Sequence, residues 1–315
     1  MWEPQFCIDW LTFTFPVGTL TGLAKGDPDS DRSDIKLLTA HAKMLLREVL
    51  GLGDQVTFCV TYPHYGMRLA LQADCGATVH FCPSFESSLE CVTVLPGSTL
   101  VIVRTAQMST RHLAQRAHAR GARCSRLDIA IDLFEGDIEA YVDDAAEHIT
   151  GDVRRQATVI RPLDDLNGTT LYVGSRKSSR FLRVYEKAKQ LGIDLGCPWV
   201  RVELEAKRRV ARAMFTQYLN GGVLPLVSDI VARYHFRSDV WNTLIQYATP
   251  GKEARRILVE DTQGKANKSE WVLRHISAIA QGIDEMTMNV FLTALATRAS
   301  NEQLAGLMND LVRLV

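Results

Sequence analysis

A tyrosine flanked by cations stands in a stretch that reads TTLYVGSRKSSRFLRVYEK. Alternation along the second half of this stretch, after a Gly-Ser turn, predicts a strand with Arg183, Tyr185 and Lys187 on one side. A phenol is a weak nucleophile near its unperturbed pKa of about 10, and it needs nearby positive charge or a metal to act. The arrangement suits attack on a phosphodiester. From these residues alone, an ordinary strand tyrosine with a hydrogen-bonded hydroxyl remains the alternative.

Two further strands carry pairs of carboxylates. The first, RLDIAIDLF, has Asp128 and Asp132 on one face, and the second, WVRVELEAK, has Glu203 and Glu205 on one face. If the two strands lie near one another in one sheet, these carboxylates converge. Hard oxygen ligands of this kind suit Mg²⁺ or Mn²⁺, which polarises a phosphate and lowers the barrier to its displacement. The alternative is a set of surface carboxylates paired with the interleaved arginines, which would contribute little stability.

In their order and in their residues, the three motifs resemble those of the replication initiation factor family, often called Rep_trans. The opening stretch CIDWLTFTF is similar to that family's first strand, and the resemblance covers roughly residues 5–215. Family members include initiators of small rolling-circle plasmids and filamentous phages, and relaxases of some integrative conjugative elements. The resemblance implies that Tyr185 is the DNA-nicking nucleophile, with Arg183 and Lys187 beside it. It also implies a fold like that of other rolling-circle nickases.

Positive charge is concentrated around these motifs, although the formal net charge of the chain is zero. Residues 171–215 contain 11 lysines and arginines against four acidic residues, a local excess of seven positive charges. A basic patch beside carboxylate metal ligands is typical of proteins that bind the phosphate backbone. The cations predicted to contact DNA are Arg176, Lys177, Arg180, Lys207 and Arg208.

Composition describes an ordinary soluble globular protein, with 46% hydrophobic and 23% charged residues. The chain has no apolar run of membrane-spanning length and no secretory leader pattern, so we expect a cytoplasmic protein without membrane contact. Seven scattered cysteines with no CxxC pair signal neither a zinc site nor a disulfide framework. The segment His80-Phe81-Cys82 lacks the second histidine of the His-hydrophobe-His motif found in better-known rolling-circle nucleases. The carboxylates are therefore the better predicted metal site.

The predicted fold class is α+β, with a mostly antiparallel central sheet, helices on one face and a helical C-terminal region. The predicted domains are a nickase domain, 1–212, and a helical region, 213–315. The C-terminal helices either pack on the sheet or form an origin-reading or dimerisation module. Besides the three motifs, strands are predicted at 8–15, 56–62, 66–72, 77–82 and 98–105. Helices are predicted at 35–50, 109–119, 138–149, 223–231, 240–247, 268–281, 284–299 and 301–314.

The sequence thus favours a metal-dependent initiator of rolling-circle DNA replication. Tyr185 would nick origin DNA, leaving a 5′-phosphotyrosine link and a free 3′-hydroxyl. The alternatives are a conjugative relaxase of an integrative element, which shares the chemistry, and a non-catalytic origin-binding regulator. Expected partners are origin DNA, single-stranded or as a cruciform or duplex, and the host helicase and polymerase. The sequence leaves open whether the chain forms a homodimer.

Overall fold

The computed structural model divides the chain into two compact units, residues 1–259 and 260–315. The described residues, all in the first unit, are 3–16, 31–51, 57–64, 67, 69–81, 90–105, 108–148, 157–163, 168–193, 198–234, 236, 239–248 and 255–257. The helices predicted at 268–281, 284–299 and 301–314 lie outside the described residues. The predicted domain boundary, 212/213, falls within a helix, Arg208–Gly221, whereas the division between compact units falls at 259/260.

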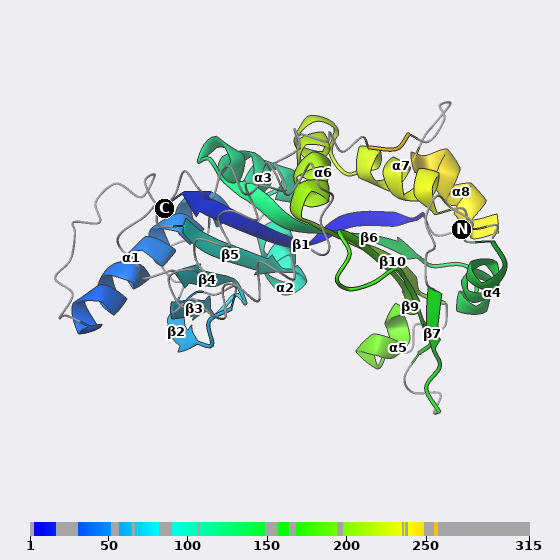
Figure 1. Cartoon of the computed structure of the whole chain (residues 1–315), viewed down its shortest axis with the longest axis horizontal. Helices are drawn as coiled ribbons and strands as arrows, with labels where there is room; N and C mark the ends of the chain where they lie inside the picture. The colour runs from blue at the N-terminus through cyan, green and yellow to red at the C-terminus, as the bar shows by residue number, and fades with distance from the viewer. Residues whose placement is uncertain are drawn as a thin grey trace, which may run out of the picture. The chain divides into compact units, whose positions relative to one another are not determined.

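A ten-stranded sheet forms the framework of the described residues, and every neighbouring pair in it is antiparallel (Figure 1). The strand order is β2-β3-β4-β5-β1-β6-β10-β9-β8-β7, so the motif-bearing strands lie side by side near its centre. The strands are β1 (Gln5–Pro16), β2 (Phe58–Thr61), β3 (Leu69–Ala73), β4 (Thr78–Phe81), β5 (Glu90–Pro96), β6 (Arg123–Leu133), β7 (Ala157–Ile160), β8 (Thr170–Val173), β9 (Arg180–Glu186) and β10 (Val200–Lys207).

Helices cover one face of this sheet and bury its apolar side chains there. Alternate residues of β6, such as Leu127 and Ile129, are fully buried, and α6 packs across them with Met214 and Phe215. The α+β class and the antiparallel sheet are thus as predicted. The helices are α1 (Asp31–Leu50), α2 (Gly97–Thr105), α3 (Thr110–Ala119), α4 (Ile138–His148), α5 (Lys187–Leu191), α6 (Arg208–Gly221), α7 (Leu224–Arg233) and α8 (Asp239–Ala248).

The strand predicted at 98–105 is wrong, because these residues form the helix α2. The β-branched run STLVIVRT favours a strand by local propensity. In the structure Leu100 and Val103, three residues apart, are fully buried, while Val101 and Ile102 are exposed. This is helical spacing, and the packing of α2 against β1 and β5 overrides the local preference. The strands β5 and β7 were not predicted.

None of the described helices is long and apolar enough to cross a membrane.

Candidate active site

The site is built on the sheet face opposite the helix-packed core, where β6, β10 and β9 lie next to one another. In β10 the buried residues Val202 and Leu204 point to the core. Side chains alternate along a strand, so Arg201, Glu203 and Glu205 occupy the other face. The antiparallel register sets Arg183 opposite Glu203, and Glu205 opposite Asp128. The predicted convergence of the three motifs on one face is confirmed.

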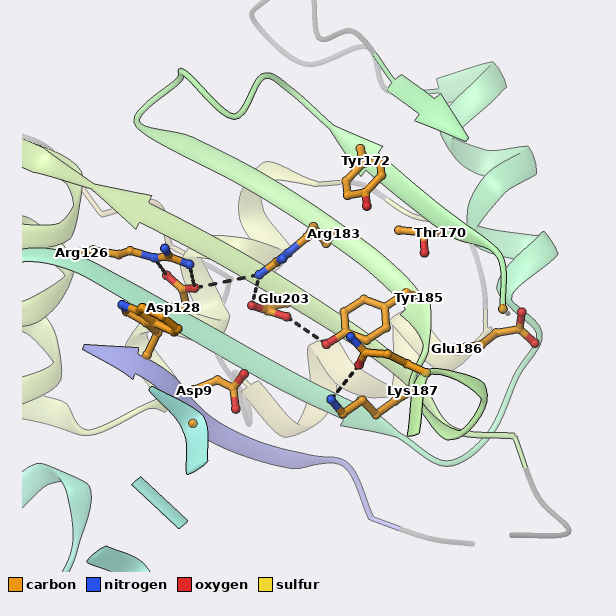
Figure 2. A pocket seen from close by; sticks show the side chains of 14 residues that line it. Asp9, Arg126, Asp128, Thr170, Tyr172, Arg183, Tyr185, Glu186, Lys187 and Glu203 are labelled. Carbon is orange, nitrogen blue, oxygen red and sulfur yellow. Dashed lines mark hydrogen bonds and ion pairs between the residues drawn. The ribbon is translucent and has the colours of Figure 1, made fainter. Parts of the chain in front are cut away.

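Tyr185 is nearly buried, with 8% of its surface exposed, and its hydroxyl donates a hydrogen bond to Glu203 (Figure 2). The distance from Oη to Glu203 Oε2 is 3.0 Å. The pKa of the Tyr185 phenol is raised well above its ordinary value, first by burial and then by the neighbouring charge of Glu203, while Arg201 acts in the opposite direction. The phenol is therefore protonated at neutral pH. Glu203 Oε2 is the acceptor toward which this proton points.

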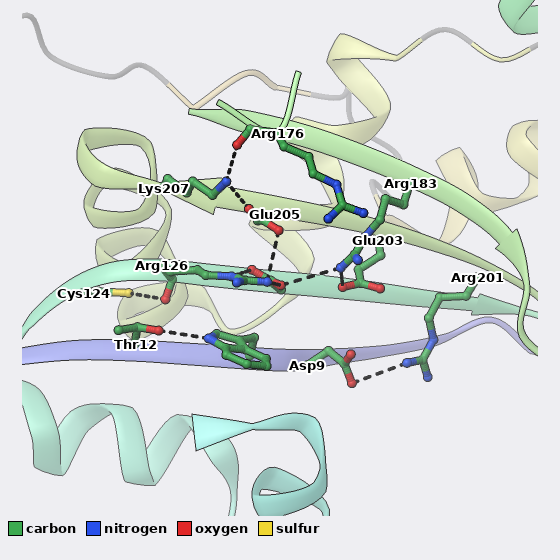
Figure 3. Close-up of polar contacts among 12 residues, drawn as sticks. Asp9, Thr12, Cys124, Arg126, Arg176, Arg183, Arg201, Glu203, Glu205 and Lys207 are labelled. Atoms are coloured by element: carbon green, nitrogen blue, oxygen red, sulfur yellow. Dashed lines mark hydrogen bonds and ion pairs between the residues drawn. The ribbon is translucent and has the colours of Figure 1, made fainter. Parts of the chain in front are cut away.

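Two arginines link the carboxylates of the site into one network (Figure 3). Arg183 donates to Glu203 Oε1, and the same Nη2 atom lies 4.0 Å from Asp128 Oδ2. Arg126 grips Asp128 with two hydrogen bonds, of 2.9 and 2.6 Å, and its Nη2 lies 3.1 Å from Glu205. Burial, followed by the charges of the neighbouring glutamates, raises the pKa of Asp128 to about 7, although Arg126 lowers it. The site thus alternates guanidinium and carboxylate groups.

Lys187 differs from its prediction in one respect: β9 ends one residue earlier, and Lys187 begins the short helix α5. Its ammonium nevertheless lies 5.7 Å from the centre of the Tyr185 ring and donates to Gln190 at 2.8 Å. Burial, followed by repulsion from Arg201, lowers the pKa of Lys187. The predicted pair of cations on either side of the tyrosine is therefore present.

Asp132 lies on the same face but faces Arg201 rather than Tyr185. Arg201 donates two hydrogen bonds to its carboxylate, of 2.7 and 2.8 Å, and Trp199 Nε1 donates a third of 2.7 Å. Arg201 also reaches Asp9, at 3.4 Å. Asp132 therefore orients Arg201, and it does not line the cavity beside the tyrosine.

A cavity of about 470 Å³ opens beside Tyr185. The cavity is lined by Asp9, Trp10, Gly97, Arg126, Asp128, Gly168, Thr170, Tyr172, Arg183, Tyr185, Glu186, Lys187, Gln190 and Glu203. Sequence reasoning missed Asp9, which lies at a register shift in β1, between Ile8 and Trp10. The available signal was that Asp9 is the single charged residue of the first strand, Gln5–Pro16. Gly97 fits closely against it, because a Cβ there would lie 2.8 Å from Asp9 Oδ1.

The cationic side chains at the turn between β8 and β9 do not lie on the same face of the sheet. Arg176 and Lys177 are exposed, whereas the side chain of Arg180 points to the helix-covered face and lies 3.5 Å from Asp229 in α7. Lys207 donates to the backbone carbonyl of Arg176 at 2.5 Å and also pairs with Glu205. Arg180, although predicted to contact DNA, therefore lies apart from the other cations of that prediction. Arg208 is exposed at the start of α6, with a left-handed φ of 55°.

The residues of the cavity partly fit a divalent cation. Asp9, Asp128 and Glu203 supply the hard oxygen donors that Mg²⁺ or Mn²⁺ prefers. Arg126 and Arg183 already hold oxygen atoms of two of these carboxylates. Within the part of the chain that the structure describes, no three Asp, Glu, His or Cys side chains stand close enough together to enclose a metal ion. The donor chemistry fits, and the arginines are the groups that an ion would have to displace.

Both the fold and the sequence of this chain match those of replication initiators. The fold is similar to the solved structure of the rolling circle replication initiator protein from Geobacillus stearothermophilus, with a TM-score of 0.60 and 19% identity over 82% of this chain and 100% of that chain. The model of the family described as replication initiation factor (Rep_trans) matches residues 122–288, more than half of the chain. The chain belongs to the replication initiation factor family. No curated protein matches it at the sequence level.

Proposed function

We propose that the chain starts rolling-circle replication by cutting one strand of its origin DNA, with Tyr185 as the nucleophile. The observation that carries the proposal is the hydrogen bond from the buried Tyr185 hydroxyl to Glu203, in a cavity that also holds Arg183 and Lys187. A nucleophile, a proton acceptor and cations for the phosphate are the parts that phosphoryl transfer to a hydroxyl requires.

The chemistry is a transesterification. Tyr185 Oη forms a bond to the phosphorus, and the bond from phosphorus to the 3′-oxygen breaks. The phenol proton passes to Glu203, and a proton from solvent completes the 3′-hydroxyl, so the phosphodiester energy is kept in a 5′-phosphotyrosine link. The 3′-hydroxyl then serves a host polymerase as primer, while a host helicase opens the duplex.

Arg183 is placed to stabilise the charge that develops on the phosphate. Its Nε is buried and has no hydrogen-bond partner among the described residues, so a donor remains for a phosphate oxygen in the cavity. Lys187 adds a second positive charge beside the tyrosine ring. Buried charges aimed at the reacting group act more strongly than they would in water.

The metal is part of the same proposal. Mg²⁺ or Mn²⁺ would be held by the carboxylates of Asp128 and Glu203. When bound, such an ion polarises the phosphate and neutralises charge in the transition state. Glu205 is not proposed as a metal ligand, because its carboxylate is already paired with Arg126 and Lys207.

Exposed cations beyond the cavity would position the strand. Arg176 and Lys177 in the turn, with Lys207 and Arg208 after β10, are proposed to contact phosphates that flank the cut. Contacts of this kind set register and affinity without reading sequence. Arg180 is left out, because its guanidinium lies against Asp229 on the other face.

A covalent-adduct assay tests the proposal. Labelled single strands covering the replicon that carries the gene are incubated with the protein and Mg²⁺ or Mn²⁺, and denaturing gels reveal protein–DNA adducts. Tyr185→Phe should abolish the adduct and leave DNA binding close to wild type, because only one hydroxyl is removed. Tyr62→Phe, at an exposed tyrosine that directly follows the edge strand β2, is the matched control.

Two outcomes would contradict the assignment. Adduct formation by Tyr185→Phe at the wild-type rate would exclude Tyr185 as the nucleophile, and the neighbouring Tyr172 would be tested next. DNA binding without any adduct in the wild-type protein would favour the non-catalytic regulator instead.

A further inference from the structure

A stack of two aromatic rings and a guanidinium lies on the open face of the sheet, beside the proposed nucleophile. The rings of Tyr172 in β8 and Phe181 in β9 are stacked, with centroids 5.4 Å apart and planes inclined by 11°. The guanidinium carbon of Arg176 lies 5.9 Å from the centre of each ring. The guanidinium is thus equally close to both rings, and the three side chains, from two strands and their connecting turn, form one surface.

The stack belongs to the cavity and not to the core. Tyr172 is half-buried and lines the cavity, and Arg176 is exposed, whereas Leu171 and Val173 of the same strand point to the helix-covered core. The steps proposed for Tyr185 make no use of the Tyr172 ring. An aromatic ring on a polar, solvent-facing sheet surface can bind a ligand that has a flat apolar face.

The opposite wall of the cavity repeats the pattern. Trp10 lines the cavity from β1, and the guanidinium carbon of Arg126 lies 4.4 Å from the centre of its ring. The Trp10 Nε1 donates to Thr12 at 2.9 Å, which fixes the orientation of the indole. The strands β6, β10 and β9 separate β1 from β8, and Figure 2 shows Arg126 and Tyr172 apart from one another, with Arg183 between them.

We propose that these aromatic residues are stacking platforms for unpaired bases, so that the cavity accepts a single strand whose bases on either side of the cut lie on Tyr172 and Trp10. This inference rests on the proposed function. Aromatic rings and guanidinium planes bind unpaired bases by stacking, and they do so without preference for sequence, because every base has a π face. Paired bases in a duplex are covered by their neighbours and cannot use such a platform. A volume of about 470 Å³ lies within the range of small-molecule sites.

The position of Tyr172 connects the platform to the chemistry. In the sheet register Tyr172 stands opposite Arg183, and Arg183 contacts the Glu203 that accepts the Tyr185 hydrogen bond. A base held on Tyr172 therefore brings its own phosphate next to the cation and the nucleophile. Tyr172 is a positioning residue, and its ring carries this role rather than its hydroxyl.

Equilibrium binding to strands with and without bases tests the inference. Fluorescence anisotropy compares labelled oligothymidylate with an oligonucleotide of equal length made of abasic tetrahydrofuran units, which keeps the phosphates and removes the bases. The full-length protein is used with a chelator present, so that no cutting occurs. The variants are Tyr172→Leu, which removes the ring, and Tyr172→Phe, which keeps it. Tyr62→Leu, at a tyrosine far from the cavity, is the control.

Wild type and Tyr172→Phe should bind the base-bearing strand about 5- to 100-fold more tightly than the abasic strand. Tyr172→Leu should reduce that ratio about fivefold or more by weakening binding of the base-bearing strand alone. Tyr62→Leu should keep the wild-type ratio. Arg176→Lys keeps the charge but loses the planar face, so it should lower the same ratio while the dependence of binding on salt stays unchanged.

Equal affinity of wild type for the two strands would overturn the inference. So would a Tyr172→Leu variant that loses affinity for both strands by the same factor. If Tyr172→Leu fails to fold, the Arg176→Lys ratio decides, and an unchanged ratio there overturns the inference. Loss of adduct formation with intact base discrimination would instead count against the proposed function, so the two failures are distinguishable.

Discussion

The hydrogen bond between Tyr185 and Glu203 makes a quantitative prediction. Glu203→Gln keeps the shape and the number of hydrogen-bonding atoms of the side chain but cannot accept a proton from the phenol. The tyrosine would then have to ionise to solvent before it attacks. We expect adduct formation to survive only at a low rate in this variant, with the fold intact.

The size of the effect follows from the pKa of the phenol. Burial and Glu203 raise the pKa of Tyr185 above its ordinary value of about 10. At pH 8, fewer than about one molecule in 100 would carry a phenolate, so attack by ionised tyrosine alone is rare. General base catalysis contributes roughly 10²- to 10⁴-fold to a rate. Glu203→Gln should therefore slow single-turnover adduct formation by about 100-fold or more.

The pH profile separates this role from a structural one. Between pH 8 and 9.5, the wild-type rate should change little, because the proton goes to Glu203 and not to hydroxide. The rate of Glu203→Gln should rise about tenfold per pH unit, because the phenolate fraction does so. Glu48→Gln, in an exposed ion pair with Arg120, controls for loss of a carboxylate elsewhere. A Glu203→Gln rate within about threefold of wild type, or one that is slow but flat with pH, would refute the reasoning.

Three other predictions address the metal ligand, the turn and the helix-covered face. The pKa of Asp128 in the folded protein, about 7, lies above its ordinary value, so the folded protein binds this proton more tightly than the unfolded chain does. With chelator present, the stability that this proton contributes should be complete below about pH 4 and be lost as the pH rises to about 7. A melting temperature of Asp128→Asn that declines with pH in parallel with that of wild type would contradict this prediction. Alanine at both Arg176 and Lys177 should weaken binding across all sequences and flatten its logarithmic salt dependence by roughly one counterion for each phosphate that the variant no longer neutralises, and an unchanged slope in a salt titration would exclude a role in phosphate binding. Asp229→Ala should lower the free energy of unfolding by about 3 kcal/mol, because it removes the buried carboxylate that Arg180 and Arg233 share. A change below about 1 kcal/mol in a denaturant titration would refute this.

Alternation was the strongest signal in the sequence, and it assigned the side chains of the three motifs to the sheet faces on which the structure has them. Val202 and Leu204 bracket Glu203 in β10, and a strand with a period of two admits only one arrangement of these side chains. The neighbouring strands obey the same rule, so the faces of all three motifs were predictable. That the strands are adjacent was an assumption of the sequence argument, and the sheet order confirms it.

The same rule could have separated Arg180 from the other cations of the turn. Arg180 is an odd number of residues from Arg183 and Tyr185, so in one continuous strand it faces the opposite side. The sequence argument grouped it with Arg176 and Lys177 by closeness in the chain. Its partner, Asp229, belongs to a helix 49 residues further along the sequence, and no local sequence pattern predicts that ion pair.

Features that depend on distant parts of the chain were less accessible. The helix α2 has the composition of a strand, and only its packing beside β1 and β5 explains its form. Asp9 enters the cavity because β1 shifts register between Ile8 and Trp10, and strict alternation does not anticipate such a shift. The stacking of Tyr172 on Phe181 depends on the diagonal neighbours of two paired strands, so it required the register.

The two faces of the sheet divide stability from chemistry. On the helix-covered face, Asp229 is fully buried and accepts hydrogen bonds from Arg233 and from the backbone of Ile257, so its loss leaves uncompensated charge within the fold. On the open face, each buried carboxylate is paired with a guanidinium. A phosphate can compete for the guanidinium, and a divalent ion can compete for the carboxylate. Glu203→Gln should therefore cost activity far more than stability, and Asp229→Ala the reverse. The charged side chains of the open face keep their positions because the apolar side chains of the same strands pack in the core on the other face.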